Sequence, residues 1–476
     1  MSILRNFIYN TIYQVFIILL PIITVPYISR VLGKEGVGIY SYTASYAQYF
    51  VLLGMIGISI YGNRQIAYNK GNREKVSKEF SNIYLLQFIT TTISLIVYLT
   101  IFVGINKENK LLFLVQGLPI LAAIFDISWL FIGYEDMKSV VIRNSIAKLI
   151  GISLIFIFVK KPSDIILYAL ILGISTCVGQ VVMWFNLTKV VSFSKPNIKE
   201  AILHLRPSLS LFISQLAIQV YVLLDKTMLG LMTDSGQVGL YDSSQKTIKL
   251  ALTLVTSLGT VMLPRMSSLY AEGKMDKFKE MIYKAFSFVN LVAIPMVFGL
   301  VAIADGFSVW FYGEKFSGIE ILLKVGSLII FAISWSNILG IQIMIPMKKE
   351  RQFTISVTIG AIVNILLNFL LIVRFKSIGT TVSSVAAEIT VTIIQLYMLR
   401  DFIEMRKILK TIYKPLIGSI LMFLVIAVIG IILPIGIIYT IIEVGIGLGV
   451  YIFTMIILKD KFLLGLLDMG LKIIKR

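Results

Sequence analysis

Two lysines and one aspartate lie inside a long apolar stretch, residues 238–263. They begin a polar series with steps of four, three, four, three and four positions: Asp242, Lys246, Lys249, Thr253, Thr256 and Thr260. This spacing places the series on one face of an α-helix. The opposite face is apolar and comprises Ile248, Leu250, Leu252 and Val255. Charge inside a membrane is costly unless it lines a cavity or is paired. One carboxylate cannot neutralise two lysines, so we expect Lys246 and Lys249 to form a cationic wall that binds an anion.

Further ionisable residues lie within apolar stretches. Asp225, in the stretch 207–231, offers a purely structural alternative, because it could pair with one lysine of the cationic wall. A second polar helical face surrounds a carboxylate and comprises Thr381, Ser384, Glu388, Thr392 and Gln395. Three roles stay open for Glu388, namely pairing with Lys324, binding a cation or carrying a proton. Asp126 is interpreted either as a group at a helix end or as a gate. Lys148 and Glu443 are expected to reach the membrane surface.

The positions of these charges matter because the chain is too apolar to be soluble. Of its 476 residues, 57% are hydrophobic and 14% are charged, against about 45–50% and 25% in a typical soluble domain. A helix needs roughly 20 apolar residues to cross a bilayer. Fourteen such spans are predicted, at 9–29, 38–61, 80–104, 112–133, 140–159, 165–186, 207–231, 238–263, 285–304, 319–345, 353–373, 378–399, 415–434 and 437–458.

Basic residues predict the orientation of these spans. Alternate loops, starting with the loop after the first span, carry only nine Lys and Arg residues, whereas most of the others lie in the remaining loops and the two tails. Positive residues concentrate on the cytoplasmic side, so both termini are expected there. The net charge of +19 is then explained by topology and by contact with anionic lipid rather than by nucleic-acid binding.

A short internal repeat indicates two lobes. The tetrapeptide Val37–Tyr40 opens the second span, and Val238–Tyr241 opens the eighth with the pattern V-G-[IL]-Y. Parallel repeats of this kind are typical of transporters that rock around a central site. The predicted architecture is therefore an all-α membrane protein with six-helix lobes at 1–206 and 207–410, followed by two additional helices and a tail at 411–476.

The sequence gives little support to an enzyme. It contains one histidine, His204, and one cysteine, Cys177, which disfavours metal and nucleophile–base sites. No nucleotide-binding G-x-x-x-x-G-K-[ST] pattern is present. We expect no cofactor, and energy for transport would come from a proton or sodium gradient or from the substrate.

Four stretches resemble a known superfamily, the multidrug/oligosaccharidyl-lipid/polysaccharide exporters, and within it the Wzx-type polysaccharide flippases. They are Pro26–Gly38, Phe125–Glu135, Leu224–Gly230 and Val261–Ser267. The family often has Gln where this chain has Ile132. The resemblance implies a MATE-like fold in a bacterial cytoplasmic membrane.

The resemblance also implies a function, which is to move undecaprenyl-pyrophosphate-linked oligosaccharide repeat units to the outer leaflet for capsule, exopolysaccharide or O-antigen synthesis. It implies partners such as a polymerase and glycosyltransferases. Lys226, Lys246, Lys249 and Lys324 are then the predicted cationic substrate site. Asp126, Asp225, Asp242 and Glu388 are the predicted coupling or gating residues. Alternatives are a cation-coupled multidrug exporter, a peptidoglycan-precursor flippase and a membrane scaffold for glycosyltransferases.

Overall fold

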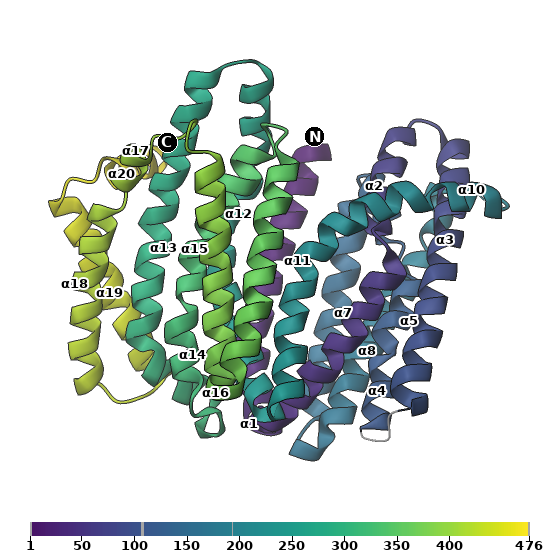
Figure 1. Cartoon of the computed structure of the whole chain (residues 1–476), viewed down its shortest axis with the longest axis horizontal. Helices are drawn as coiled ribbons and strands as arrows, with labels where there is room; N and C mark the ends of the chain where they lie inside the picture. Colours follow the sequence, from purple (N-terminus) through teal and green to yellow (C-terminus); the bar gives the residue numbers. More distant parts are fainter. Residues whose placement is uncertain (1, 106–108, 193, 475–476) are drawn as a thin grey trace. The chain divides into compact units, whose positions relative to one another are not determined.

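The computed structural model describes residues 2–105, 109–192 and 194–474, and every regular element in these ranges is a helix (Figure 1). Ten of the described helical segments are long and apolar enough to cross a membrane. The prediction of an all-α, multi-pass membrane protein is confirmed. The chain packs as two compact units, Met1–Gly230 (unit 1) and Leu231–Arg476 (unit 2).

Unit 1 consists of helices whose buried faces meet in several apolar clusters, one of which is built around Ile58, Phe80, Trp129 and Val190. Its elements in chain order are α1 (Ser2–Met55), α2 (Ile58–Asn69), α3 (Arg73–Leu99), η1 (Thr100–Ile105), α4 (Lys110–Gln116), α5 (Leu118–Ile124), α6 (Ser128–Gly133), α7 (Met137–Phe158), η2 (Pro162–Asp164), α8 (Ile165–Trp184), α9 (Leu187–Val190), α10 (Ile198–Leu203) and α11 (Leu205–Met232).

Unit 2 has its largest apolar cluster between α12, α13, α15 and α16. Its elements are α12 (Ser235–Ala271), α13 (Met275–Tyr312), η3 (Glu314–Phe316), α14 (Ile319–Gly326), α15 (Leu328–Ser336), η4 (Asn337–Met344), α16 (Glu350–Met398), α17 (Met405–Leu409), α18 (Tyr413–Ile432), α19 (Ile437–Ile457) and α20 (Lys461–Ile474).

Two of the longest helices each contain a sharp corner and cover two predicted spans. α1 turns at Gly33, where φ is 70° and ψ is 175°, a conformation open to glycine because it has no Cβ. α16 turns at Lys376, where φ is 49° and ψ is −129°. The predicted spans 207–231 and 238–263 correspond to α11 and α12. The total of fourteen stays a prediction, as do the lobe boundaries at 206 and 410.

The predicted span 112–133 corresponds to a candidate membrane span, Lys110–Gly133, whose helix is interrupted twice. It is divided into α4, α5 and α6, with breaks at Gly117 and at residues 125–127. Pro119 lies in the first turn of α5, where its missing N–H costs no helical hydrogen bond. The second break is held open by side chains from other helices, which are described below.

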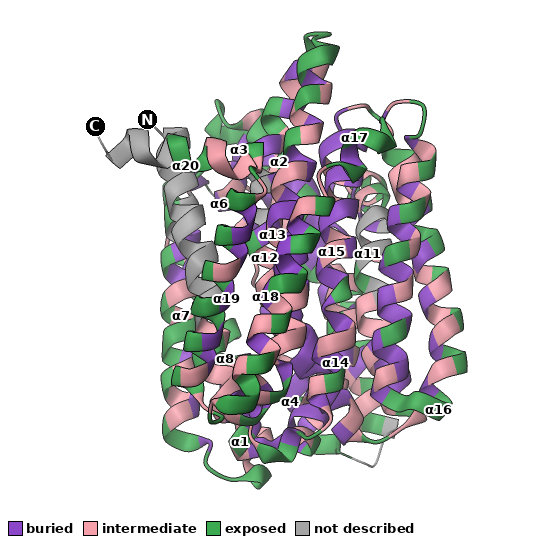
Figure 2. Cartoon of the chain, turned by 90° about the vertical axis from the view of Figure 1, so that its left-hand side faces the viewer, coloured by how far each residue is buried: buried purple, intermediate pink, exposed green. Residues whose placement is uncertain are grey.

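The last two long helices, α18 and α19, form a hairpin that packs on α13 within unit 2. Met422, Ile426, Tyr451 and Met455 share a buried cluster with Leu291 of α13. The Tyr451 hydroxyl also donates a hydrogen bond to the Leu291 carbonyl, at 2.7 Å. The outward faces of both helices are exposed (Figure 2) and rich in isoleucine and leucine, as expected for surfaces in contact with lipid.

Candidate functional site

The two faces predicted for residues 238–263 are present on α12. On one face, Ile248 and Val255 are buried in the largest cluster of unit 2. On the other, Lys246 and Lys249 are exposed. The Lys246 Nζ atom lies 2.7 Å from Oδ2 of Asp242, whose side chain is buried. This i,i+4 ion pair leaves two ammonium groups and one carboxylate on the face, as the sequence predicts. The side chain of Thr260 lies outside the described part of the structure.

α12 is fixed in place by polar contacts with neighbouring helices. The Tyr241 hydroxyl is hydrogen-bonded to Ser384 Oγ of α16 at 3.0 Å, and the Tyr312 hydroxyl of α13 donates to the Ser243 carbonyl at 3.0 Å. Val238 and Tyr241 of the repeated tetrapeptide are both buried. The repeat at this position therefore packs the beginning of α12 and orients the lysine face one turn further along.

The polar face predicted around Glu388 is buried within unit 2. All five of its members are less than a tenth exposed: Thr381, Ser384, Glu388, Thr392 and Gln395. Thr392 Oγ1 donates to the Ala332 carbonyl of α15 at 3.0 Å. Gln395 Nε2 donates to Ser356 Oγ, in the first half of α16, at 3.1 Å. This face is therefore packed against other helices, with a carboxylate at its centre.

Lys324 does not pair with Glu388, which was one of the three roles left open for that carboxylate. Instead, the Lys324 Nζ atom lies 2.7 Å from both carboxylate oxygens of Asp305 on α13. Its helix, α14, meets α12 through Gly326, where a Cβ would lie 2.4 Å from Ile248 Cδ1. That contact is with the apolar face of α12, opposite Lys246.

In unit 1, Asp225 and Lys226 lie on α11. Asp225 is 1% exposed, and Lys226 is half-buried. The adjacent Thr227 Oγ1 is hydrogen-bonded to the Tyr49 hydroxyl of α1 at 3.2 Å. The predicted site combines Lys226 of unit 1 with lysines of unit 2, and its assembly into one cavity stays a prediction.

The motif containing Asp225 and Lys226 ends in Gly230, and the close contact of this residue with α1 explains why it is a glycine. A Cβ at this position would lie 2.2 Å from Cδ2 of Tyr42, closer than any real carbon contact. The tyrosine ring of α1 therefore packs directly on the backbone of α11.

Asp126 lies at the break between α5 and α6. Its Oδ1 atom accepts a hydrogen bond from the Ser128 backbone N–H at 2.9 Å, so the carboxylate satisfies a donor at the start of α6. The backbone carbonyl of Asp126 accepts from Gln87 Nε2 at 2.9 Å. This contact is local to the break. Both interpretations of Asp126, as a group near the inner end of the span that reaches toward water and as a gate, stay predictions.

Gln87 of α3 holds the break together. It is fully buried, and its Nε2 atom also donates to the Ala123 carbonyl at 2.8 Å. Its Oε1 atom accepts from Trp129 Nε1 at 2.9 Å. Trp184 of α8 donates to a third carbonyl at the break, that of Phe125, at 3.0 Å. Broken helices within a membrane require such partners for their backbone groups.

Arg143 of α7 is a buried charge that the sequence reading does not single out. It is 7% exposed, and its guanidinium donates to Gln180 Oε1 at 2.8 Å and to Ser128 Oγ at 3.2 Å. Gln180 also lines a cavity of about 350 Å³ within unit 1, together with Lys148. Because Arg143 lies inside the predicted span 140–159, the rule applied to Lys148 could have identified it.

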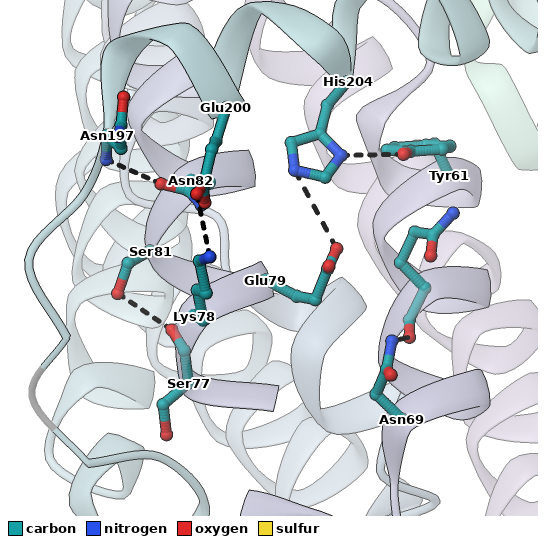
Figure 3. A network of polar contacts seen from close by, with 11 residues as sticks. Tyr61, Asn69, Ser77, Lys78, Glu79, Ser81, Asn82, Asn197, Glu200 and His204 are labelled. Carbon is teal, nitrogen blue, oxygen red and sulfur yellow. Dashed lines mark hydrogen bonds and ion pairs between the residues drawn. The ribbon is translucent and has the colours of Figure 1, made fainter. Parts of the chain in front are cut away.

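The segment that leads into α11 is fastened to α3 by a polar network (Figure 3). Asn82 is central, since its Oδ1 accepts from the Asn197 backbone N–H at 2.7 Å and its Nδ2 donates to Glu200 at 2.7 Å. Lys78 lies 2.8 Å from the same carboxylate and is the largest cause of the lowered pKa of Glu200. These contacts hold α10 against α3.

His204 sits at the end of this network, between a phenol and a carboxylate (Figure 3). Its Nδ1 atom is hydrogen-bonded to the Tyr61 hydroxyl at 2.7 Å, and its Nε2 atom lies 3.8 Å from Glu79 Oε2. Burial lowers the pKa of His204, and the nearby carboxylates of Glu79 and Glu200 oppose this shift. The histidine therefore favours its neutral form.

Comparison with known proteins places these features in a family. A family model described as "Polysaccharide biosynthesis protein" matches residues 3–270, more than half of the chain. The chain belongs to this family. The matched region contains all four stretches on which the predicted resemblance rests, so the resemblance is confirmed at the family level.

One relative in this polysaccharide biosynthesis family covers most of the chain. The Escherichia coli (strain K12) protein named "Putative O-antigen transporter" is 27% identical over 416 residues, which are 84% of this chain and 97% of that protein.

Solved structures show the same fold at low sequence identity. A structure of the lipid II flippase MurJ in an inward closed conformation has a TM-score of 0.79 and 16% identity, covering 94% of this chain and 98% of its own. An inward-facing multidrug resistance MATE family transporter of the MOP superfamily has a TM-score of 0.61 and 13% identity, covering 82% and 96%. The predicted MATE-like fold is confirmed.

Proposed function

We propose that this protein is a flippase for lipid-linked oligosaccharides, which it moves from the inner to the outer leaflet of a bacterial cytoplasmic membrane. The cargo is an oligosaccharide repeat unit on undecaprenyl pyrophosphate, used for capsule, exopolysaccharide or O-antigen synthesis. Membership of the polysaccharide biosynthesis family and the similarity to a protein named as an O-antigen transporter support the transport of a glycan precursor. Both termini face the cytoplasm in this proposal.

The observation that carries the proposal is the lysine face of α12. Lys246 and Lys249 are exposed on a helix whose opposite face is buried in a core, so their position is fixed while their ammonium groups stay accessible. Asp242 compensates one positive charge and also orients Lys246. A pyrophosphate carries several negative charges, and accessible ammonium groups at mid-membrane depth favour its entry.

In this mechanism the two six-helix lobes rock against each other and expose the site to one side of the membrane at a time. The pyrophosphate contacts Lys246 and Lys249, with Lys226 as a further candidate cation. Lys324 is paired with Asp305 at a different cavity of unit 2 and is left out of this contact. The polyprenyl tail stays in lipid. Proton or sodium movement through Asp126, Asp225, Asp242 or Glu388 supplies the energy. Glycosyltransferase partners act before transport, and a polymerase acts after it.

The test is the sidedness of lipid-linked oligosaccharide in cells that produce Lys246→Ala/Lys249→Ala. We expect full-length units to accumulate on the inner leaflet and the flipping rate to fall about tenfold or more, equivalent to about 1.4 kcal/mol of lost binding to the transported state. Lys246→Arg/Lys249→Arg keeps the charges and should retain most of the activity.

A matched control is Lys284→Ala, because Lys284 forms an i,i+4 ion pair with Glu280 on α13 but lies outside the proposed site. It should leave sidedness unchanged. Normal sidedness in the double alanine variant, at wild-type protein levels, would exclude the lysine face as the substrate site. Normal sidedness in cells lacking the protein altogether would exclude the flippase function itself. Impaired export of lipid II in those cells would instead indicate a peptidoglycan-precursor flippase.

A further inference from the structure

A second cavity, of about 780 Å³, lies within unit 2 between α13, α14 and the α18–α19 hairpin. Its volume is in the range of small-molecule sites. It is lined by apolar side chains and three hydroxyls, and its charged lining residues are Asp305, Glu314, Glu320, Lys324 and Glu443. The cavity lies on the α14 side of unit 2 and shares only Lys324 with the predicted substrate site.

Glu443 is the distinctive group in this cavity. The sequence predicts that it reaches water at a helix end, but the structure buries it to 9% exposure on α19, against the cavity. Among the described residues, no hydrogen bond or ion pair reaches its carboxylate. A Cβ on Gly430 of α18 would lie 3.3 Å from Glu443 Oε1, so the glycine leaves space for the carboxylate. Because Glu443 borders the cavity, a ligand of opposite charge bound there would pair with its carboxylate.

The other charges do not supply that ligand. Lys324 is held by both oxygens of Asp305 at 2.7 Å. Glu320 accepts from the Gly318 backbone N–H at 3.0 Å, and Glu314 is exposed at the rim. Four carboxylates against one ammonium give the lining a net charge of −3. The lining therefore offers hydrogen-bond acceptors and negative charge, which suit a cation that donates hydrogen bonds.

The spread of the carboxylates favours an organic cation over a metal ion. Within the described ranges, no three acidic, histidine or cysteine side chains converge closely enough to hold a metal. α18 and α19, which form one wall of the cavity, have exposed outward faces (Figure 2). Ile431 and Ile435 line the cavity and are 86% and 61% exposed. A charged floor bordered by exposed apolar side chains fits an amphiphile.

We propose that this cavity binds the ammonium head group of a membrane lipid. Glu443 receives the ammonium through charge-assisted hydrogen bonds. The lipid phosphate lies toward Lys324, and the acyl chains follow the apolar surface of Ile431 and Ile435. The ligand class is a phospholipid with a primary amine in its head group, such as phosphatidylethanolamine. This site does not depend on the proposed flippase function.

Trp310 provides a local reporter for the test. Its Nε1 atom donates to Thr440 Oγ1 at 2.8 Å, and Thr440 lines the cavity. The full chain is reconstituted in phosphatidylglycerol vesicles containing increasing fractions of dibrominated phosphatidylethanolamine or dibrominated phosphatidylglycerol. Bromine quenches nearby tryptophans, and the signal of the other three tryptophans is measured in Trp310→Phe and subtracted.

We expect Trp310 to be quenched at a several-fold lower fraction of the brominated phosphatidylethanolamine. Glu443→Gln should reduce this preference at least about fivefold. Gly430→Ala, which keeps the charge but places a methyl group beside the carboxylate, should also weaken it and serves if Glu443→Gln folds poorly. Glu404→Gln is the matched control, because Glu404 is an exposed carboxylate paired with Lys407 outside the cavity.

Equal quenching by the two lipids in the wild-type protein would overturn the proposal. A phosphatidylethanolamine preference that survives Glu443→Gln in a folded protein would also overturn it. A soluble alkylammonium that relieves quenching only in the wild-type protein supports an ammonium site at Glu443. If the alkylammonium binds but the wild-type protein shows no preference between the two brominated lipids, the assignment of the ligand to a lipid is overturned.

Discussion

Replacing Gln87 by leucine tests how the break between α5 and α6 is stabilised. The substitution removes three hydrogen bonds, to the backbone carbonyls of Ala123 and Asp126 and from the Trp129 indole N–H. A buried hydrogen bond contributes about 1 kcal/mol in soluble proteins, and interhelical bonds in a membrane protein average about 0.6 kcal/mol. Three such bonds predict a loss of roughly 2–3 kcal/mol in the free energy of unfolding.

The assay is reversible unfolding in mixed detergent micelles, compared with Gln48→Leu as a control at an exposed glutamine within α1. A double-mutant cycle sharpens the test. Trp129→Phe removes the indole bond together with part of a buried ring. The cycle subtracts the packing loss, so Gln87→Leu should cost about 0.6–1 kcal/mol less in the Trp129→Phe background than in the wild type. If Gln87→Leu costs no more than Gln48→Leu, Gln87 does not hold the break. If Gln87→Leu and Trp129→Phe are additive, the hydrogen bond between these two side chains contributes nothing to it.

Two further predictions concern the packing and titration of unit 1. Gly230→Val should prevent α11 from docking on Tyr42, because even a Cβ would overlap the ring; folded protein measured by size-exclusion chromatography should fall strongly, whereas Gly449→Val, in open space on α19, should not affect it. The lowered pKa of His204 means that the unfolded chain binds this proton more tightly, so the protein should lose stability as pH falls below about 6.5, the ordinary histidine value. His204→Gln should flatten the dependence of the melting temperature on pH between 7.5 and 5.5, and an unchanged slope would exclude His204 as its source.

The membrane-spanning character of the chain and the two-faced nature of α12 follow from the sequence. Apolar content and helical periodicity are properties of contiguous residues, and the ion pair between Asp242 and Lys246 is a local i,i+4 contact. The same reasoning predicts the polar face around Glu388, although it cannot say whether that face is packed or open.

The break in the predicted span 112–133 could be located only partly from the sequence. Gly117 and Pro119 mark its first interruption, but the second falls at Phe125–Ile127, where no proline or glycine stands. That interruption persists because Gln87 and Trp184, from helices far away in the chain, satisfy the carbonyls that it frees.

The sequence also does not predict which charged residues pair with each other. Lys324 pairs with Asp305, which lies 19 positions earlier on another helix, and not with Glu388. Glu443 faces a cavity formed by α13, α14, α18 and α19.

The sequence by itself determined that the chain is a helical membrane protein and which helix faces are polar, because hydrophobicity and periodicity are read along neighbouring residues. Only the tertiary structure decided which charges are paired, which line cavities and where a helix breaks, because those outcomes depend on which distant helices pack together.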